Sequence, residues 1–263
     1  MRAARRHPGP DGMSMDMAPN RKLDRKDVNR FLRQKGLVAL ADKSNAAHLQ
    51  CFALTPDVVF DIGVDSGTPF LYQAFPEAHF VLIDPRAESE KTLSTPDAPA
   101  KASFHQLALG AEAGEMTLNI PYSDKGEQGA MASLRQRQGY LADKIEWVET
   151  RQVAVDRLDS IAAAYPGRVG LKVDTEGFED EVLAGAPETL ARCDFVILEM
   201  SLTQRFDTTT PPSQIIARLA AAGLEFRDVL RMTGDGRGGP APRLMDILFT
   251  RWAADAPAPL NHA

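Results

Sequence analysis

Short apolar runs alternate with amphipathic segments through the middle of the chain. Uninterrupted apolar runs of this length are typical of strands that are buried on both faces of a parallel sheet. Segments with helical spacing lie between the runs, and strand–helix alternation predicts βαβ units in a doubly wound α/β fold. The predicted strands are residues 58–60, 80–83, 171–173 and 195–198, and the predicted helices are residues 69–75, 88–93, 161–164 and 179–190.

The pattern changes near the two ends of the chain. Residues 24–35 and 45–52 have helical spacing, which predicts two helices before the first strand. A helix over residues 213–222 is followed by two apolar strands, at residues 225–230 and 244–251. The loop GDGRGGPAP between these strands leaves no room for a crossover helix. The two strands must therefore pair antiparallel or leave the sheet.

Length and composition indicate one domain with short extensions. The chain has 263 residues, of which 44% are hydrophobic and 25% charged, as in ordinary globular proteins. We expect a single domain over residues 23–252, with disordered extensions at 1–22 and 253–263. Cys51 and Cys193 are too few for a disulfide framework, and no segment reaches the roughly 20 apolar residues of a membrane span. These features favour a cytoplasmic protein without a membrane span.

The first candidate site is a glycine-containing turn after the first strand. The segment VVFDIGVDSG places four residues at this turn, and Asp84 ends the next apolar run. Ligands of open parallel sheets bind beyond the carboxyl ends of the strands, where a carboxylate can accept hydrogen bonds from both ribose hydroxyls. Similar turns also occur in α/β proteins that bind nothing there. The predicted cofactor-binding residues are Asp61, Gly63, Asp65, Gly67 and Asp84.

The charge of this turn bears on the identity of the ligand. A dinucleotide site prefers the pattern GxGxxG, whereas Asp65 occupies the position of the middle glycine and would repel a pyrophosphate. The sulfonium and ammonium groups of S-adenosylmethionine would tolerate such an acidic rim. The net charge of −6 argues against a nucleic-acid surface.

The most distinctive segment is KVDTEGFE, in which Asp174 ends a strand and Glu176 opens the next helix. A further apolar run ends at Glu199. Together with VVFDIGVDSG, LIDP, QLALGAEAGEMTL and RQVAVDRLDSI, these motifs resemble the FkbM family of S-adenosylmethionine-dependent methyltransferases over roughly residues 57–201. The family commonly has Asn at the position of Asp65 and Glu at that of Asp84, and both replacements can make the expected hydrogen bonds.

The resemblance implies a doubly wound, mostly parallel, seven-stranded Rossmann-like methyltransferase sheet with an antiparallel edge strand. It also implies transfer of a methyl group from S-adenosylmethionine to oxygen, on a sugar hydroxyl or a glycosylated metabolite. The expected partner is therefore a small-molecule or glycan acceptor. Two other interpretations stay open: a nicotinamide-dependent oxidoreductase, and a non-catalytic module of the same fold that binds S-adenosylmethionine.

Methyl transfer requires an acceptor oxygen that is held in line and loses its proton. Asp174 and Glu176 lie at the same strand end as the cofactor crevice. Either carboxylate could be the general base, or the pair could hold a divalent cation that lowers the pKa of the acceptor. The structural alternative is that Asp174 only caps the helix beginning at Glu176. The sequence does not require a metal, and it does not define the oligomeric state.

The segment PYSDKGEQGAMASLRQRQGYLADKIEWVETRQ, residues 121–152, is long and polar for a connection inside a compact domain. Long loops of this kind are usually functional or disordered. We expect either a lid over the acceptor, with Arg135 and Arg137 as substrate-binding residues, or an ordinary solvated insertion with an extra hairpin.

Overall fold

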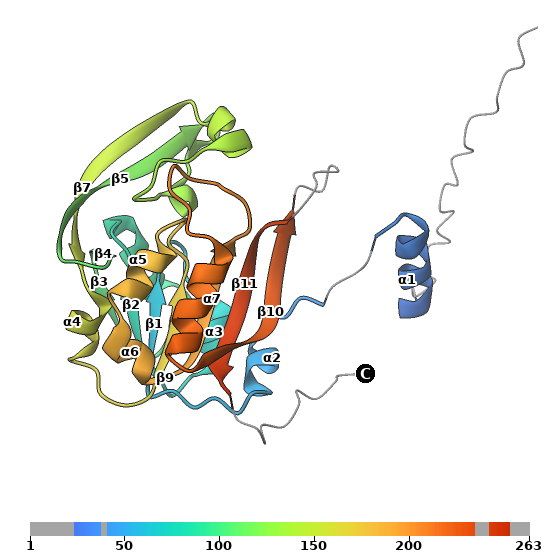
Figure 1. The fold of residues 1–263 in the computed structure, drawn as a ribbon, viewed down its shortest axis with the longest axis horizontal. Helices are drawn as coiled ribbons and strands as arrows, with labels where there is room; N and C mark the ends of the chain where they lie inside the picture. Colours follow the sequence, from blue (N-terminus) through green and yellow to red (C-terminus); the bar gives the residue numbers. More distant parts are fainter. Residues whose placement is uncertain (1–23, 38–40, 235–241, 253–263) are drawn as a thin grey trace, which may run out of the picture. The chain divides into compact units, whose positions relative to one another are not determined.

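The computed structural model describes residues 24–37, 41–234 and 242–252 (Figure 1). The chain divides into two compact units, Met1–Ala41 and Asp42–Ala263. Helix α1 (Arg25–Gln34) belongs to the first unit, and the Asp24 carboxylate caps it by accepting a hydrogen bond from the backbone N–H of Lys26. The predicted domain began at residue 23, whereas the unit that contains the sheets begins at Asp42. The termini predicted to be disordered, 1–22 and 253–263, lie outside the described residues.

The second unit is built on a seven-stranded sheet with the strand order β10-β11-β9-β8-β1-β2-β3. Strands β9, β8, β1, β2 and β3 pair in parallel, while β11 is antiparallel to β9 and to the edge strand β10. The predicted Rossmann-like sheet and its antiparallel terminal strands are therefore confirmed. The bounds are β1 (Val58–Ile62), β2 (His79–Ile83), β3 (Ala102–His105), β8 (Val169–Val173), β9 (Cys193–Ser201), β10 (Leu224–Gly234) and β11 (Pro242–Arg251).

Helices cover both faces of this sheet, because successive residues of its strands point to opposite sides. Phe60 packs into a core with helices α4 to α7, and its neighbour Val59 packs into a second core with α2 and α3. Figure 1 shows α5, α6 and α7 together on one face. The bounds are α2 (Ala46–Gln50), α3 (Pro69–Ala74), η1 (Ala87–Ser94), α4 (Leu158–Ala162), α5 (Glu179–Ala184), α6 (Pro187–Ala191) and α7 (Pro212–Ala221).

The helix predicted over residues 179–190 is two helices, α5 and α6. Gly185 separates them where the backbone approaches a neighbouring loop so closely that a Cβ would lie 2.1 Å from the carbonyl oxygen of Gly110. Pro187 then starts α6, since proline suits a first helical turn but cannot continue a helix. The segment predicted as a helix at residues 88–93 is the 3-10 helix η1.

A second, four-stranded sheet contains the two ends of the long polar segment, in the order β4-β7-β5-β6. Its main feature is the antiparallel pair β5 (Gly114–Ser123) and β7 (Trp147–Asp156). Figure 1 shows this pair beyond one end of the seven-stranded sheet. The remaining elements are β4 (Ala108–Leu109), β6 (Gly126–Glu127) and the 3-10 helices η2 (Gly129–Met131) and η3 (Gly139–Lys144). Among the described residues, no helix has the length and apolar character needed to cross a membrane.

Candidate functional site

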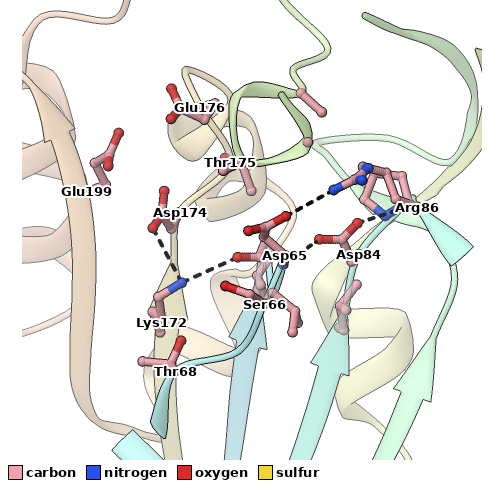
Figure 2. Close-up of a pocket in the computed structure, with 18 of the residues that line it drawn as sticks. Asp65, Ser66, Thr68, Asp84, Arg86, Lys172, Asp174, Thr175, Glu176 and Glu199 are labelled. Carbon is pink, nitrogen blue, oxygen red and sulfur yellow. Dashed lines mark hydrogen bonds and ion pairs between the residues drawn. The ribbon is translucent and has the colours of Figure 1, made fainter. Parts of the chain in front are cut away.

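A cavity of about 510 Å³ lies at the carboxyl ends of β1, β2 and β8 (Figure 2). This volume falls within the usual range for small-molecule sites. The turns after these strands supply three of its walls, and residues 129–134 of the long polar segment supply another. The cavity therefore lies where open parallel sheets bind their ligands.

The glycine turn after β1 touches the turn after β8 through backbone atoms. Gly63 has a φ of +77°, and a Cβ at this position would lie 1.8 Å from the carbonyl oxygen of Asp174. Only glycine fits this conformation and this approach without displacement. The close contact brings the predicted cofactor turn and the predicted catalytic turn to one place.

Asp84 has both carboxylate oxygens fixed by backbone donors. Its Oδ2 accepts a hydrogen bond from Asp65 N at 3.0 Å, and its Oδ1 accepts one from Arg86 N at 2.8 Å. Burial raises the pKa of this carboxyl group, and the two backbone donors partly offset that rise. Each carboxylate oxygen can accept a further hydrogen bond, which is what pairing with two ribose hydroxyls requires.

Arg86 is a neighbour of the cofactor turn that sequence reasoning missed. Its Nη1 lies 3.0 Å from Asp65 Oδ1, and its Nη2 pairs with Glu127 of β6. Gly129 lies against the guanidinium, since a Cβ there would be 2.1 Å from Nη1. The rim of the turn is therefore less acidic than the sequence indicated. The motif LIDP ends directly before Arg86, so the resemblance gave no signal for this residue.

Asp61 is completely buried beneath the glycine turn and does not line the cavity. The Tyr72 hydroxyl donates to its Oδ2 at 2.7 Å. Lys172 Nζ lies 3.3 Å from Asp61 Oδ1 and 3.5 Å from Asp174 Oδ2, and Figure 2 shows the contact with Asp174. Burial disfavours the charge on Lys172, but Asp61 and Asp174 outweigh this effect and raise its pKa. Lys172, the first residue of KVDTEGFE, thus links the two turns.

Three carboxylates gather on the β8 side of the cavity. Oxygen atoms of Asp174, Glu176 and Glu199 lie within 4.8 Å of one another, and such oxygen ligands suit a divalent cation. Arg205 already places a positive charge there, with Nη2 at 2.6 Å from Glu176 and Nη1 at 2.9 Å from Glu199. Burial, together with Asp174 and Glu176, raises the pKa of Glu199.

The turn that carries Glu176 is held by Glu179 rather than by Asp174. Glu176 has a φ of +53°, and Glu179 Oε1 accepts hydrogen bonds from Thr175 N at 3.1 Å and Gly177 N at 2.9 Å. Helix α5 begins at Glu179, after an N-cap at Phe178 without a side-chain cap, so the alternative that Asp174 caps a helix at Glu176 is wrong. Burial raises the pKa of Glu179 to about 7.

Arg135 and Arg137, the predicted acceptor-binding residues, do not line this cavity. Arg137 Nη2 lies 3.0 Å from Glu176 Oε2, and Arg135 Nη2 lies 3.1 Å from Glu181 Oε1. Their guanidinium groups also lie over aromatic rings. A direct contact of these arginines with an acceptor stays a prediction.

The seven-stranded sheet and the cavity define a Rossmann-like protein with a candidate nucleoside-type cofactor site at the glycine turn. Residues 50–230 match the family described as "Methyltransferase FkbM domain". The chain belongs to the FkbM methyltransferase family, as the motifs implied. The family is one of S-adenosylmethionine-dependent methyltransferases, and no curated protein gives a significant match.

Solved methyltransferase structures resemble this chain at low identity. A methyltransferase FkbM from Methylobacillus flagellatus KT shares 16% identity with a TM-score of 0.45, over 82% of this chain and 46% of its own. This chain therefore spans about half the length of that protein. Magnesium protoporphyrin IX methyltransferase from Synechocystis PCC 6803 shares 12% identity with a TM-score of 0.43, over 89% of this chain and 86% of its own. Fibrillarin from Aeropyrum pernix shares 12% identity with a TM-score of 0.41, over 83% of this chain and 72% of its own.

Proposed function

We propose that this chain transfers a methyl group from S-adenosylmethionine to a hydroxyl oxygen of a sugar or of a glycosylated metabolite. The observation that carries the proposal is the contact of Gly63 with Asp174. This contact brings the turn beside Asp84, the proposed ribose ligand, and the turn with Asp174, the proposed base, together at one cavity. Bound S-adenosylmethionine supplies a methyl carbon that is activated by positively charged sulfur. The residues of the chain then have to orient the cofactor, align the acceptor and take its proton.

Asp84 is the proposed ribose ligand, and the backbone of the Gly63–Gly67 turn is the proposed wall beside the methionine part. The two backbone donors that hold the Asp84 carboxylate leave it rigid and oriented. A rigid acceptor loses little conformational entropy when it binds two hydroxyl groups. Close to this site, Asp65 has a left-handed φ of +43°, and its carboxylate pairs with Arg86 at 3.0 Å.

Asp174 is the proposed general base. Its side chain is 30% exposed and contacts Lys172 at 3.5 Å, whereas Glu176 Oε2 is held at 2.6 and 3.0 Å by two guanidinium groups. These two contacts occupy the Glu176 oxygen, whereas Asp174 keeps an exposed carboxylate at the cavity. With the cofactor bound, Asp174 would accept the proton of the acceptor hydroxyl during methyl transfer.

The polar character of the acceptor end supports a polyhydroxylated acceptor. Glu199, Arg231 and Asp246 line this part of the cavity together with Asp174 and Glu176. Arg231 is half-exposed and donates to Asp246 at 2.8 Å. Carboxylates and guanidinium groups provide the acceptors and donors that a sugar with several hydroxyls requires.

Calorimetry with S-adenosylmethionine, S-adenosylhomocysteine and NAD tests the cofactor assignment. We expect binding of the first two but not of NAD, and a loss of about 1.5–3 kcal/mol in the Asp84→Ala variant, because hydrogen bonds to a charged group are lost. Asp97→Ala is the matched control, since Asp97 is an exposed carboxylate in the same connection between β2 and β3. Binding of NAD without any binding of S-adenosylmethionine would refute the assignment.

A chelator separates a base mechanism from a metal-assisted one. Arg205 already pairs with two of the three clustered carboxylates, so we expect turnover to persist in EDTA. Loss of turnover that is restored by Mg²⁺ or Mn²⁺ would instead assign the cluster of Asp174, Glu176 and Glu199 to a divalent cation.

A further inference from the structure

Two arginines from distant parts of the chain meet at Glu176. Arg137 Nη2 and Arg205 Nη2 lie 3.0 and 2.6 Å from the same oxygen, Glu176 Oε2. The side chains of these arginines are only 5% and 8% exposed. Both guanidinium groups also contact the ring of Phe206, at 4.7 and 5.4 Å from its centroid. The charges of this buried group depend on one another, because removal of one partner from a buried ion pair leaves the other charge uncompensated.

The segments that carry the two arginines are also joined by their backbones. Gln138 N donates to the carbonyl oxygen of Arg205 at 2.7 Å, and Asp207 N donates to that of Gln136 at 2.8 Å. Arg137 and Phe206 form an isolated antiparallel bridge between these two hydrogen bonds. The segment after η2 and the segment after β9 are therefore fixed to each other at the point where both contact Glu176.

Residues 129–134, here called the strap, connect this group with the cofactor side of the cavity. All residues of the strap except Met131 line the cavity. At its start, Gly129 lies against the Arg86 guanidinium, which pairs with Asp65 and Glu127. At its end, Ser133 Oγ donates to the carbonyl oxygen of Glu176 at 2.6 Å.

Arg137 adds a second contact between the strap and Glu176. Its Nη2 donates to the carbonyl oxygen of Met131 at 3.1 Å as well as to the Glu176 carboxylate. Glu176 thus contacts the strap directly through its backbone carbonyl. Its side chain is linked to the strap through Arg137.

We propose that Glu176, Arg137 and Arg205 form an anchor that positions the strap against the acceptor half of the cavity. These three are positioning residues, and Asp174 is left as the carboxylate that touches the acceptor. The inference rests on the proposed function for its kinetic consequences, but the position of the strap can be measured without turnover. Through this anchor, Arg137 would affect acceptor binding although it does not line the cavity.

Glu176→Gln tests the anchor, because glutamine keeps the size of the side chain and one acceptor oxygen but removes the charge. Hydrogen–deuterium exchange of peptides covering residues 129–134 should become at least about tenfold faster, because Arg137, which donates to Met131 of the strap, is no longer held by a charged contact with Glu176. The acceptor KM should rise about tenfold with kcat within about threefold of wild type, as expected for lost positioning rather than lost chemistry. The Kd for S-adenosylmethionine should stay within about twofold.

Arg205→Lys and Arg218→Ala complete the experiment. Lysine keeps the charge but cannot bridge two carboxylates in the planar geometry of arginine, so Arg205→Lys should lie between wild type and Arg205→Ala in strap exchange and in KM. Arg218 pairs with Asp180 at 2.8 Å between α7 and α5 and does not line the cavity. Loss of that pair should leave strap exchange and acceptor kinetics unchanged.

Three outcomes decide the matter. Faster strap exchange in Glu176→Gln with a normal melting temperature supports the anchor, even if no acceptor is methylated and the proposed function fails. Unchanged strap exchange in a folded Glu176→Gln protein overturns it. A fall in kcat at constant KM, with loss of the acidic limb of the kcat–pH profile, also overturns it, because Glu176 would then be the base.

If Glu176→Gln does not fold, Arg137→Lys replaces it in the exchange measurement. Strap exchange should then also become faster than in the wild-type protein.

Discussion

Asp174 and Glu176 lie two residues apart but have different partners. Asp174 contacts Lys172, which it shares with the buried Asp61, and it remains partly exposed at the cavity. Glu176 is paired with two arginines and is more deeply buried. These different neighbours are the reason why we propose a chemical role for Asp174 and a positioning role for Glu176.

Asp174→Asn should lower kcat by about 100-fold or more, because general base catalysis typically contributes about 10²–10⁴. The Kd for S-adenosylmethionine should change little, since asparagine keeps the shape of the side chain. Asp180→Asn is the control, as Asp180 lies close in sequence but pairs with Arg218 away from the cavity. Steady-state kinetics and calorimetry give the two quantities, and wild-type turnover in Asp174→Asn would remove Asp174 from the chemistry.

The raised pKa of Glu179 should make the free energy of unfolding depend on pH. Burial raises its folded pKa from 4.5 to about 7, so the folded state binds the proton more tightly than the unfolded state. Its contribution to the free energy of unfolding is complete at pH values below about 4.5 and declines as the pH rises to about 7. The decline amounts to about 1.4 kcal/mol for each unit of pKa difference.

The Glu179→Gln variant isolates this contribution, because the amide oxygen can still accept the hydrogen bonds from Thr175 and Gly177. Denaturant unfolding should show that the stability of the variant relative to wild type increases between pH 4.5 and pH 7. Glu188→Gln, at an exposed position of α6, controls for the removal of an acidic group. A constant difference between Glu179→Gln and wild type over this range would contradict the expected shift.

At the scale of elements, the contact between the turns after β1 and β8 is the feature on which the site depends most. Gly63→Ala adds a Cβ that would lie 1.8 Å from a backbone oxygen and also strains a φ of +77°. Gly126 has a φ of +90°, but a Cβ added there would have no atom within 4 Å. The Gly126→Ala variant therefore measures the cost of backbone strain without a steric clash. We expect about 1–2 kcal/mol of destabilisation for Gly126→Ala and at least about 3 kcal/mol for Gly63→Ala.

Unfolding measurements and S-adenosylmethionine titrations compare the two alanine variants. Only Gly63→Ala should also lose cofactor affinity, because the strand ends that form the cavity must move apart. Equal destabilisation of the two variants, with equal affinity for S-adenosylmethionine, would show that the close approach of the turns is unimportant.

Strands β1, β2, β8 and β9 could be predicted because their apolar runs are buried on both faces and end in acidic residues, whereas β3 is half-buried along its length and has no such run. Gly63, Asp65, Gly67 and Asp84 could likewise be placed at the cavity, since their positions follow from the strand ends. The break between α5 and α6 could not, because it depends on the approach of Gly185 to Gly110, distant in sequence.

The cations of the site were missed for the same reason. Lys172, Arg86 and Arg205 acquire their roles from partners on other strands and loops, and no local spacing marks those partners. The second sheet was foreseen only as an extra hairpin, because β5 and β7 are long but largely exposed or half-buried.

At the scale of the described part of the second unit, the large sheet provides the cofactor turn and the second sheet carries the strap across the cavity. Contacts at both ends hold the strap, with Arg86 on one side and Glu176 on the other. The proposed cofactor side near Asp84 and the proposed acceptor side near Asp174 thus share one wall of the cavity. This arrangement suits a transfer reaction, because both reactants must be aligned before the methyl group moves.

Transfer of a labelled methyl group tests the proposed reaction itself. The protein is incubated with S-adenosylmethionine labelled in its methyl group and with glycan and glycolipid extracts, and the labelled product is identified by mass spectrometry. We expect label in an alkali-stable methyl ether on a sugar oxygen, formed by the wild-type protein and by Asp97→Ala but strongly reduced in Asp174→Asn. Label on nitrogen or carbon, or no transfer to any extract by a protein that binds S-adenosylmethionine, would contradict it.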